Sequence, residues 1–226
     1  MLGRIERNII IMSKGKSYAV FGLGRYGSAV AKELVENGAE VLAVDLNQNV
    51  VNEVASYIPY CKCADVTDPE VIKQLGISNM DVVVISMAES LEASVMATML
   101  CKEAGVGTVI VKAATEMNCK ILNKIGADKV VFPESESGIR LAKNLLSSGF
   151  MDIFDLSNDV SIVELEVKDE WVGKSLIELN LRKKYGMNVI SIIEGEKIDT
   201  NINPELPLTK EMKLIVIANV SMLSKL

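Results

Sequence analysis

The sequence predicts an α/β protein with a doubly wound parallel sheet, followed by a second, smaller α+β domain. Between residues 17 and 150, short β-branched runs alternate with helical patterns, the order expected of parallel strands joined by helical crossovers. Most of these runs are apolar along their whole length, as strands covered by helices on both faces are. After residue 150 the pattern changes, because the run over 160–167 alternates between apolar and polar residues. The second part is therefore expected to be a separate domain.

The boundaries of the elements follow from local signals. Gly38 is a natural C-cap for a helix over 28–38, and Asp68 followed by Pro69 is a natural start for a helix over 68–76. A longer helix is expected over 90–105, and the second domain is expected to contain one amphipathic helix over 174–186. Strands are expected over 18–22, 40–45, 60–64, 81–86, 108–113 and 129–133 in the first domain, and over 160–167, 187–193 and 213–219 in the second.

These signals divide the chain into four segments. Residues 1–16 form an N-terminal extension, and 17–138 form a nucleotide-binding, Rossmann-like domain. Residues 139–150 are expected to form a linker helix, and 151–226 the smaller domain, whose size favours dimerisation because pairing gains burial. Within the extension, Met12 is an alternative starting residue, and the residues before it are expected to add nothing to nucleotide binding.

Composition excludes several classes of function. The chain has 226 residues, 49% of them hydrophobic, and a net charge of −6, so it can build a core but lacks the basic surface that attracts nucleic acid. Its longest apolar stretches are far below the roughly 20 residues that cross a bilayer. Without histidine or a C-x-x-C pair, the four cysteines do not predict a metal site. Cys61 and Cys63 are expected to share one strand face and to pack as small apolar groups.

The stretch 18-YAVFGLGRYGSAVAKEL-34 predicts a phosphate-binding turn between a strand and a helix. Gly22 would permit the turn, Gly24 would let a diphosphate approach the backbone, and Gly27 would let the helix pack closely on the sheet. Asp45, at the end of the next strand, is placed to accept hydrogen bonds from ribose hydroxyls. A bare G-x-G-x-x-G is weak evidence, but the order strand, glycines, helix, strand and aspartate is strong evidence for nucleotide binding.

Two further residues are candidates for nucleotide contacts. Asp65 follows the third strand and could accept from an adenine amino group, although it could instead cap a helix, the role favoured for Asp68. Arg25 could pair with a terminal phosphate, the alternative being a solvated loop cation. The neighbouring Tyr26, Leu46 and Val66 are assigned to the same site.

Catalysis is not expected. Hydride transfer would need an acid or base and a substrate domain, and neither histidine nor a large second domain is available. Phosphoryl transfer through a P-loop would need G-x-x-x-x-G-K-[ST], which the sequence lacks. Binding without chemistry is the leading class of function.

The blocks 20-VFGLGRYGSAVAKEL-34, 44-VDLN-47, 63-CADVTD-68, 126-GADKVVFPESESG-138 and 180-NLRKKYGMNVISI-192, in that order, resemble the KtrA/TrkA family of cytosolic gating subunits of potassium uptake channels. The resemblance runs from about Lys16 to the C-terminus. It implies an RCK_N and an RCK_C domain, which regulate potassium conductance. It also implies dimers that assemble into an octameric ring beneath a membrane-embedded pore subunit of the KtrB/TrkH type. The protein would then be cytoplasmic, at the inner face of the membrane.

The resemblance also implies ligands and their contacts. ATP or ADP would bind along Gly22, Gly24 and Gly27, with Arg25 reaching the γ-phosphate across a dimer interface. Glu134 would hold Mg²⁺ or Ca²⁺ near the phosphates, although it could simply be an acid at a helix start. Cyclic di-AMP, bound by Gram-positive members, would contact Ile177, Arg182, Asn188 and Pro204. The alternative for Arg182 is a solvated helix end.

Two other functions stay open. The full dinucleotide fingerprint also suits an NAD(H)-dependent oxidoreductase or a redox-sensing regulator, which NADH binding far tighter than ATP would support. A nucleotide-binding repressor is disfavoured by the acidic charge.

Overall fold

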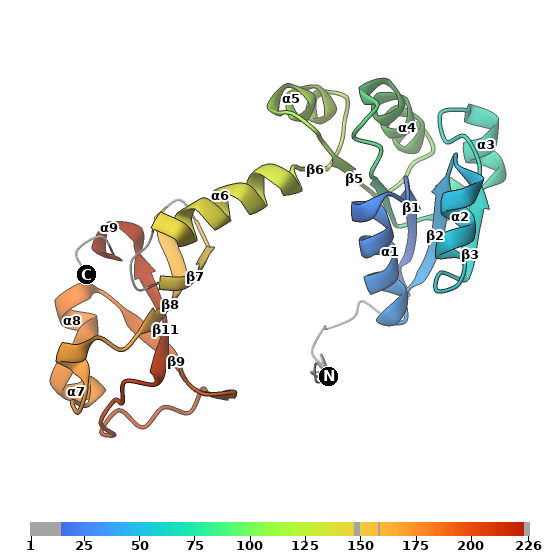
Figure 1. Cartoon of the computed structure of the whole chain (residues 1–226). Coiled ribbons are helices and arrows are strands. Elements are labelled where there is room, and N and C mark those ends of the chain that lie inside the picture. The colour runs from blue at the N-terminus through green and yellow to red at the C-terminus, as the bar shows by residue number, and fades with distance from the viewer. Residues whose placement is uncertain (1–14, 147–149, 158, 224–226) are drawn as a thin grey trace. The chain divides into compact units, whose positions relative to one another are not determined.

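The computed structural model describes residues 15–146, 150–157 and 159–223. The chain divides into two compact units, with the division after Pro133, and each unit is described by itself (Figure 1). Among the described residues, no helix is long and apolar enough to cross a membrane. Most of the predicted N-terminal extension lies outside the described residues.

The first unit alternates strands and helices. Its elements are β1 (Ser17–Phe21), α1 (Arg25–Glu36), β2 (Glu40–Asp45), α2 (Gln48–Val54), β3 (Tyr60–Cys63), α3 (Pro69–Gln74), η1 (Ile77–Asn79), β4 (Val82–Ile85), α4 (Leu91–Glu103), β5 (Thr108–Lys112), α5 (Glu116–Lys124) and β6 (Lys129–Val131).

The strands form one parallel six-stranded sheet in the order β3-β2-β1-β4-β5-β6. From β1 the chain proceeds outward to β3 and then crosses to β4 on the other side of β1, so that the strand order reverses between β1 and β4. In the register of this reversal, Phe21 lies opposite Val44 on one side and Ile85 on the other. The predicted doubly wound sheet is confirmed. Folds of this kind bind ligands outside the carboxyl ends of the strands at the reversal.

The sheet is covered on both faces, as its apolar strands predicted. On one face, Ala31 of α1 and Val54 of α2 pack against Val20 of β1. On the other face, residues of α3, α4 and α5 pack against Ala19 and Phe21, and Figure 1 shows these helices in green and turquoise. The last three side chains of β1, Ala19, Val20 and Phe21, are therefore buried whichever way they point, which fixes the strand and the turn that follows it.

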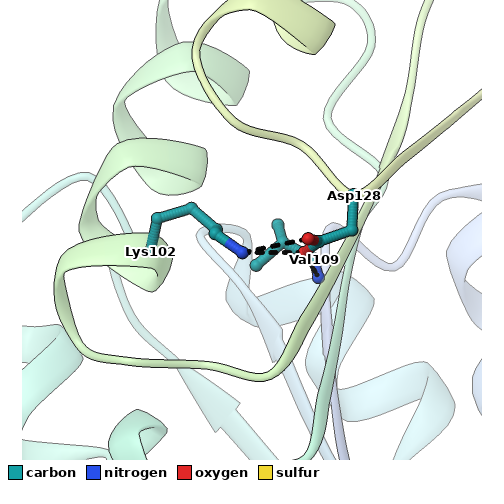
Figure 2. A network of polar contacts seen from close by, with 3 residues as sticks. All are labelled: Lys102, Val109 and Asp128. Atoms are coloured by element: carbon teal, nitrogen blue, oxygen red, sulfur yellow. Dashed lines mark hydrogen bonds and ion pairs between the residues drawn. The ribbon is translucent and has the colours of Figure 1, made fainter.

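Two acidic side chains fasten the amino edge of this sheet. The ammonium group of Lys102 on α4 lies 2.9 Å from a carboxylate oxygen of Asp128, and the same oxygen accepts from the backbone N–H of Val109 at 2.7 Å (Figure 2). Asp81 accepts from the backbone N–H of Ser17 at 2.8 Å. These hydrogen bonds hold the pKa of both carboxyls below the ordinary value, the side-chain bond from Lys102 being the main cause for Asp128 and the backbone bond from Ser17 for Asp81.

The expectation that both strand cysteines pack inside is only half right. Cys61 is partly buried against the core, but Cys63 is exposed. The difference arises because β3 is an edge strand, and Cys63 is its last residue. Its thiol donates instead to the carbonyl oxygen of Leu46 at 3.2 Å.

The second unit begins with a helix and continues as an antiparallel sheet. Its elements are α6 (Pro133–Leu146), β7 (Phe150–Asp155), β8 (Val160–Glu166), η2 (Asp169–Trp171), α7 (Leu176–Leu179), α8 (Leu181–Tyr185), β9 (Asn188–Glu194), β10 (Lys197–Asp199), β11 (Met212–Asn219) and α9 (Val220–Leu223). The sheet order is β10-β9-β11-β8-β7, and its core includes Trp171, Met187 and Leu214.

Three boundaries of this unit differ from those predicted. Pro133 begins α6 rather than ending a strand, because its fixed φ suits a first helical turn, and the predicted domain boundary after residue 138 falls inside this helix. The helix expected over 174–186 is broken into α7 and α8 at Asn180, whose φ of 48° is left-handed. Strands β7 and β10 were not predicted.

Candidate functional site

The glycine turn after β1 is closed on two sides by backbone. Gly22 has a φ of 84°, and a Cβ on it would lie 2.9 Å from the carbonyl oxygen of Ser86. A Cβ on Gly27 would lie 1.9 Å from the carbonyl oxygen of Gly22. Both glycines are therefore required by packing, as the sequence predicted for the turn and for the close approach of the helix.

Neither packing nor backbone conformation requires a glycine at position 24. It is the N-cap of α1 with a φ of −64°, which any residue adopts, and a Cβ built on it would meet no protein atom within 4 Å. As a glycine, it has no side chain that could cap α1. The turn thus leaves open space at a helix N-terminus, where N–H groups and the positive end of the helix dipole favour an anion.

Asp45, at the end of β2, links the turn to the neighbouring strand. One carboxylate oxygen accepts from the backbone N–H of Leu23 at 2.7 Å, and the other accepts from that of Asn47 at 2.8 Å. A carboxylate offers about four acceptor positions, so Asp45 can shape the loop and still accept from a ribose hydroxyl. The sequence did not predict this structural role.

Asp65 lies beyond the end of β3, next to Asp45 along the carboxyl edge, because Cys63 is paired with Asp45. One of its oxygens accepts from the Oγ1 and the N–H of Thr67 at 2.7 and 2.9 Å. These bonds, chiefly the one from the side chain, lower the pKa of the Asp65 carboxyl. Asp68 caps α3 by accepting from the N–H of Glu70 at 2.8 Å, the role predicted for it.

The side chains around the turn differ in their exposure. Arg25, the first residue of α1, is exposed and forms no ion pair among the described residues. Leu46 is 70% exposed, whereas Val66 is 4% exposed and belongs to the core. Val66 could therefore meet a ligand only through its backbone, while Leu46 offers an exposed apolar surface beside Asp45.

Three residues at this edge were not singled out from the sequence. Ser86 and Met87 follow β4 and contact the space around Gly22. Lys112 ends β5, and its ammonium nitrogen lies 5.6 Å from the centroid of the Tyr26 ring. The signal that could have found them is the strand order, because β4 lies beside β1, and β5 beside β4, only when the sheet reverses direction there.

The predicted ligand residues of the second unit come from α7, α8, the start of β9 and the segment between β10 and β11. The N–H of Ile177 donates to the carbonyl oxygen of Pro204 at 3.2 Å, and Ile177 is 59% exposed. Arg182 on α8 and Asn188 at the start of β9 are also exposed. No hydrogen bond joins Arg182 to Asn188 within the described part of the chain.

A small cleft of about 210 Å³ opens elsewhere in this unit, between β9, β10 and the segment over 202–208. Ligand pockets are typically 300–1,000 Å³. None of the four predicted residues lines the cleft, which is lined by Ile192, Glu194, Lys197, Asp199, Ile202, Asn203, Leu206, Pro207, Leu208 and Met212.

Glu134 is placed in the first turn of α6, in agreement with the expected helix start. Among the described residues, no group of three or more cysteine or acidic side chains is arranged to hold a metal ion. Glu134 could thus supply one carboxylate ligand, and the rest of a coordination shell would come from a nucleotide, from water or from another subunit.

Comparisons with known proteins cover both units. The TrkA-N domain family model matches residues 18–133, and the TrkA-C domain model matches residues 160–226. The Ktr system potassium uptake protein C of Bacillus subtilis is 38% identical over 93% of this chain and 95% of its own length. The Ktr system potassium uptake protein A of Vibrio alginolyticus is 36% identical over 89% of this chain and 91% of its own.

Solved structures support the fold. The GsuK channel bound to NAD superposes with a TM-score of 0.66 at 17% identity, over 92% of this chain but only 38% of the channel chain. The TrkA-N domain of the inner membrane protein ybaL from Escherichia coli superposes with a TM-score of 0.53 at 15% identity, over 58% of this chain and 97% of that domain. With both domain models matched in order and relatives of 38% identity along nearly the whole length, the chain belongs to the family of TrkA-N and TrkA-C potassium uptake proteins.

Proposed function

We propose that this protein is the cytoplasmic regulatory subunit of a potassium uptake system and binds an adenine nucleotide at the carboxyl edge of its parallel sheet. The observation that carries the proposal is the geometry of the glycine turn. Backbone atoms occupy the space that a Cβ on Gly22 or Gly27 would need, whereas a Cβ on Gly24 would point into open space at the helix N-terminus. A protein that kept only the fold would have no need of a glycine at position 24.

Each residue at this edge has a role in the proposed binding. The N-terminus of α1 and Gly24 bind the phosphates, and Asp45 accepts from the ribose. Asp65 accepts from the adenine amino group through the carboxylate oxygen that does not bind Thr67, and Leu46 packs against the nucleoside. Arg25 has no acidic partner among the described residues, and it pairs with the terminal phosphate of a nucleotide, on its own or on an adjoining subunit.

Regulation follows from differential binding. We propose, as the resemblance to gating subunits implies, that dimers of this chain assemble in a ring docked on a membrane-embedded potassium channel subunit. A nucleotide that binds one ring shape more tightly than another shifts the population toward that shape, and by no more than the difference in affinity. No bond is broken in such a cycle, and we expect no enzymatic turnover.

A divalent cation, Mg²⁺ or Ca²⁺, is proposed to assist through Glu134. Hard cations bind carboxylate and phosphate oxygens together, and Glu134 with nucleotide phosphates would satisfy that preference. We expect Glu134→Gln to leave ATP binding measurable by calorimetry while removing its enhancement by the cation. Enhancement that persists in the variant would leave Glu134 as a helix-start acid only.

Cyclic di-AMP is proposed as a second ligand, bound between two copies of the TrkA-C domain. Ile177 and Pro204 are joined by a backbone hydrogen bond and offer exposed apolar contacts for the bases, while Arg182 and Asn188 offer donors to the phosphates. A two-fold ligand fits a two-fold dimer, so one molecule per two chains is expected. Arg182→Ala should then weaken cyclic di-AMP strongly and leave ATP affinity unchanged. An absence of binding by the wild-type protein would leave this domain as a dimerisation module.

The test of the main proposal compares ligands on the full chain. Calorimetry and thermal shifts with ATP, ADP, NAD and NADH should show binding of adenine nucleotides, and potassium flux through the reconstituted partner should change with the nucleotide bound. The alternative function is an NAD(H)-dependent oxidoreductase or redox-sensing regulator. NADH binding far tighter than ATP, or hydride transfer to a panel of hydroxy acids and carbonyl compounds, would favour it.

A further inference from the structure

Lys112 reaches the phosphate edge of the sheet from a strand that the nucleotide fingerprint does not include. In the sheet register, Phe21 of β1 lies opposite Ile85 of β4, which lies opposite Val111 of β5. The residues that follow these three, Gly22, Ser86 and Lys112, therefore lie in a row along the carboxyl edge. Adjacent strands are about 4.8 Å apart, so Lys112 starts roughly 10 Å from the turn, and its side chain is long enough to cover much of that distance.

The side chain of Lys112 is directed back toward the turn. Its ammonium nitrogen lies 5.6 Å from the centre of the Tyr26 ring, and Tyr26 is the second residue of α1, two positions after Gly24. A cation at this distance is attracted by the negative face of the ring. The ring thus contacts this ammonium group beside the open N-terminus of α1.

The position of Lys112 relative to the turn indicates which part of a bound nucleotide it would meet. Asp45 ends β2 and Asp65 comes after β3, so a bound adenosine lies on that side of β1. A nucleotide that extends from this adenosine across Gly24 continues toward the ends of β4 and β5. In ATP or ADP the groups that arrive there are terminal phosphates, whereas in a dinucleotide the diphosphate is followed by a second nucleoside without that charge.

We propose that Lys112, held by Tyr26, binds the terminal phosphate and makes the site selective for nucleoside di- and triphosphates over dinucleotides. The inference deepens the proposed function and rests on it. Lys112 and Arg25 approach the same phosphates from different elements, β5 and α1. The ammonium ion gains a charge-assisted hydrogen bond from a phosphate oxygen and gains no such partner from a second ribose.

The test compares ATP, ADP and NADH on Lys112→Met, which keeps the apolar stem and removes the charge. Calorimetry should show a loss of about tenfold to hundredfold for ATP and ADP, with NADH changed less than about twofold. The salt dependence of ATP binding should also become shallower, because one phosphate contact is lost. Lys112→Arg should retain most of the ATP affinity, and Tyr26→Leu should give an intermediate loss.

Lys129→Met is the matched control, because Lys129 is an exposed lysine at the start of β6, on the opposite edge of the sheet. It should change none of the affinities. Equal losses of ATP and NADH in Lys112→Met, or no loss of ATP, would overturn the role of Lys112 while leaving nucleotide binding by the wild-type protein intact. A wild-type protein that binds no adenine nucleotide would overturn the proposed function itself.

Discussion

The two edges of the parallel sheet use acidic and basic side chains differently. At the amino edge, Asp128 is paired with Lys102 and with a backbone N–H, and Asp81 is bonded to Ser17. At the carboxyl edge, Asp45 accepts from the backbone N–H groups of Leu23 and Asn47, and Arg25 forms no ion pair among the described residues. The amino edge is built to hold the strands together.

The glycines sharpen the same contrast. Gly22 and Gly27 are surrounded by backbone, whereas Gly24 faces open space in the same turn. Arg25, which forms no ion pair among the described residues, and the open Gly24 at the N-cap of α1 both occur at one edge. The comparison teaches that a ligand edge differs from a structural edge in the polar groups that remain available to a ligand. The number of charged residues does not distinguish the two edges.

The largest expected effect is that of Gly27→Ala. The new methyl group would overlap the carbonyl oxygen of Gly22, so the turn and α1 must separate, which should destabilise the protein by about 1–3 kcal/mol or more. ATP binding should fall below detection. Urea unfolding and calorimetry on the same sample provide both measurements.

Gly24→Ala is the matched control within that turn. Its methyl group meets no protein atom, so the free energy of unfolding should change by less than about 1 kcal/mol, while ATP affinity falls at least about tenfold because the methyl group occupies the ligand's approach. Equal damage to stability in both alanine variants would contradict the distinction between the two glycines.

Asp45→Asn should come next in size. We expect ATP affinity to fall by roughly 1.5–3 kcal/mol, the range for hydrogen bonds to a charged group, with a smaller loss of stability because Leu23 and Asn47 lose the carboxylate. Asp68→Asn provides the comparison on the same edge. Asparagine caps a helix as well as aspartate does, so neither stability nor affinity should change, and an equal ATP loss there would remove Asp45 from the site.

Asp128→Asn should have the opposite profile. The free energy of unfolding should fall by about 1 kcal/mol, because the Lys102 pair is partly exposed and screened by solvent, and ATP affinity should stay the same. Weaker ATP binding in this variant would show that the two edges are coupled, against the separation drawn above.

The smallest expected effect is the pH dependence that Asp128 contributes at the amino edge. The folded-state pKa of Asp128 is lowered by Lys102 and Val109, so its contribution is fully present above the unfolded value of about 3.9 and is lost as pH falls through the lower folded value. The stability gap between the wild type and Asp128→Asn should therefore close in urea titrations carried from pH 6 to pH 3. A gap that stays constant over that range would exclude the carboxylate as its source.

Much of this architecture could be predicted from the sequence because its signals are local. The apolar runs, Gly38, Asp68 and Pro69 specify strands, caps and turns within a few residues of themselves. The second domain was less predictable. Short strands such as β10 carry little pattern of their own, and Asn180 breaks a helix that periodicity alone would continue.

The sequence by itself determined the doubly wound sheet, the glycine turn and Asp45 as its acidic companion, because strand, turn and helix signals depend on neighbours in the chain. Only the tertiary structure decided that Gly24 is open while Gly27 is closed, that Asp45 ties down Leu23, and that Lys112 lies over Tyr26. These facts depend on strand order and register, which bring residues as far apart as 26 and 112 into contact. No pattern of adjacent residues carries that information, since the pairing is set by how the whole sheet is packed.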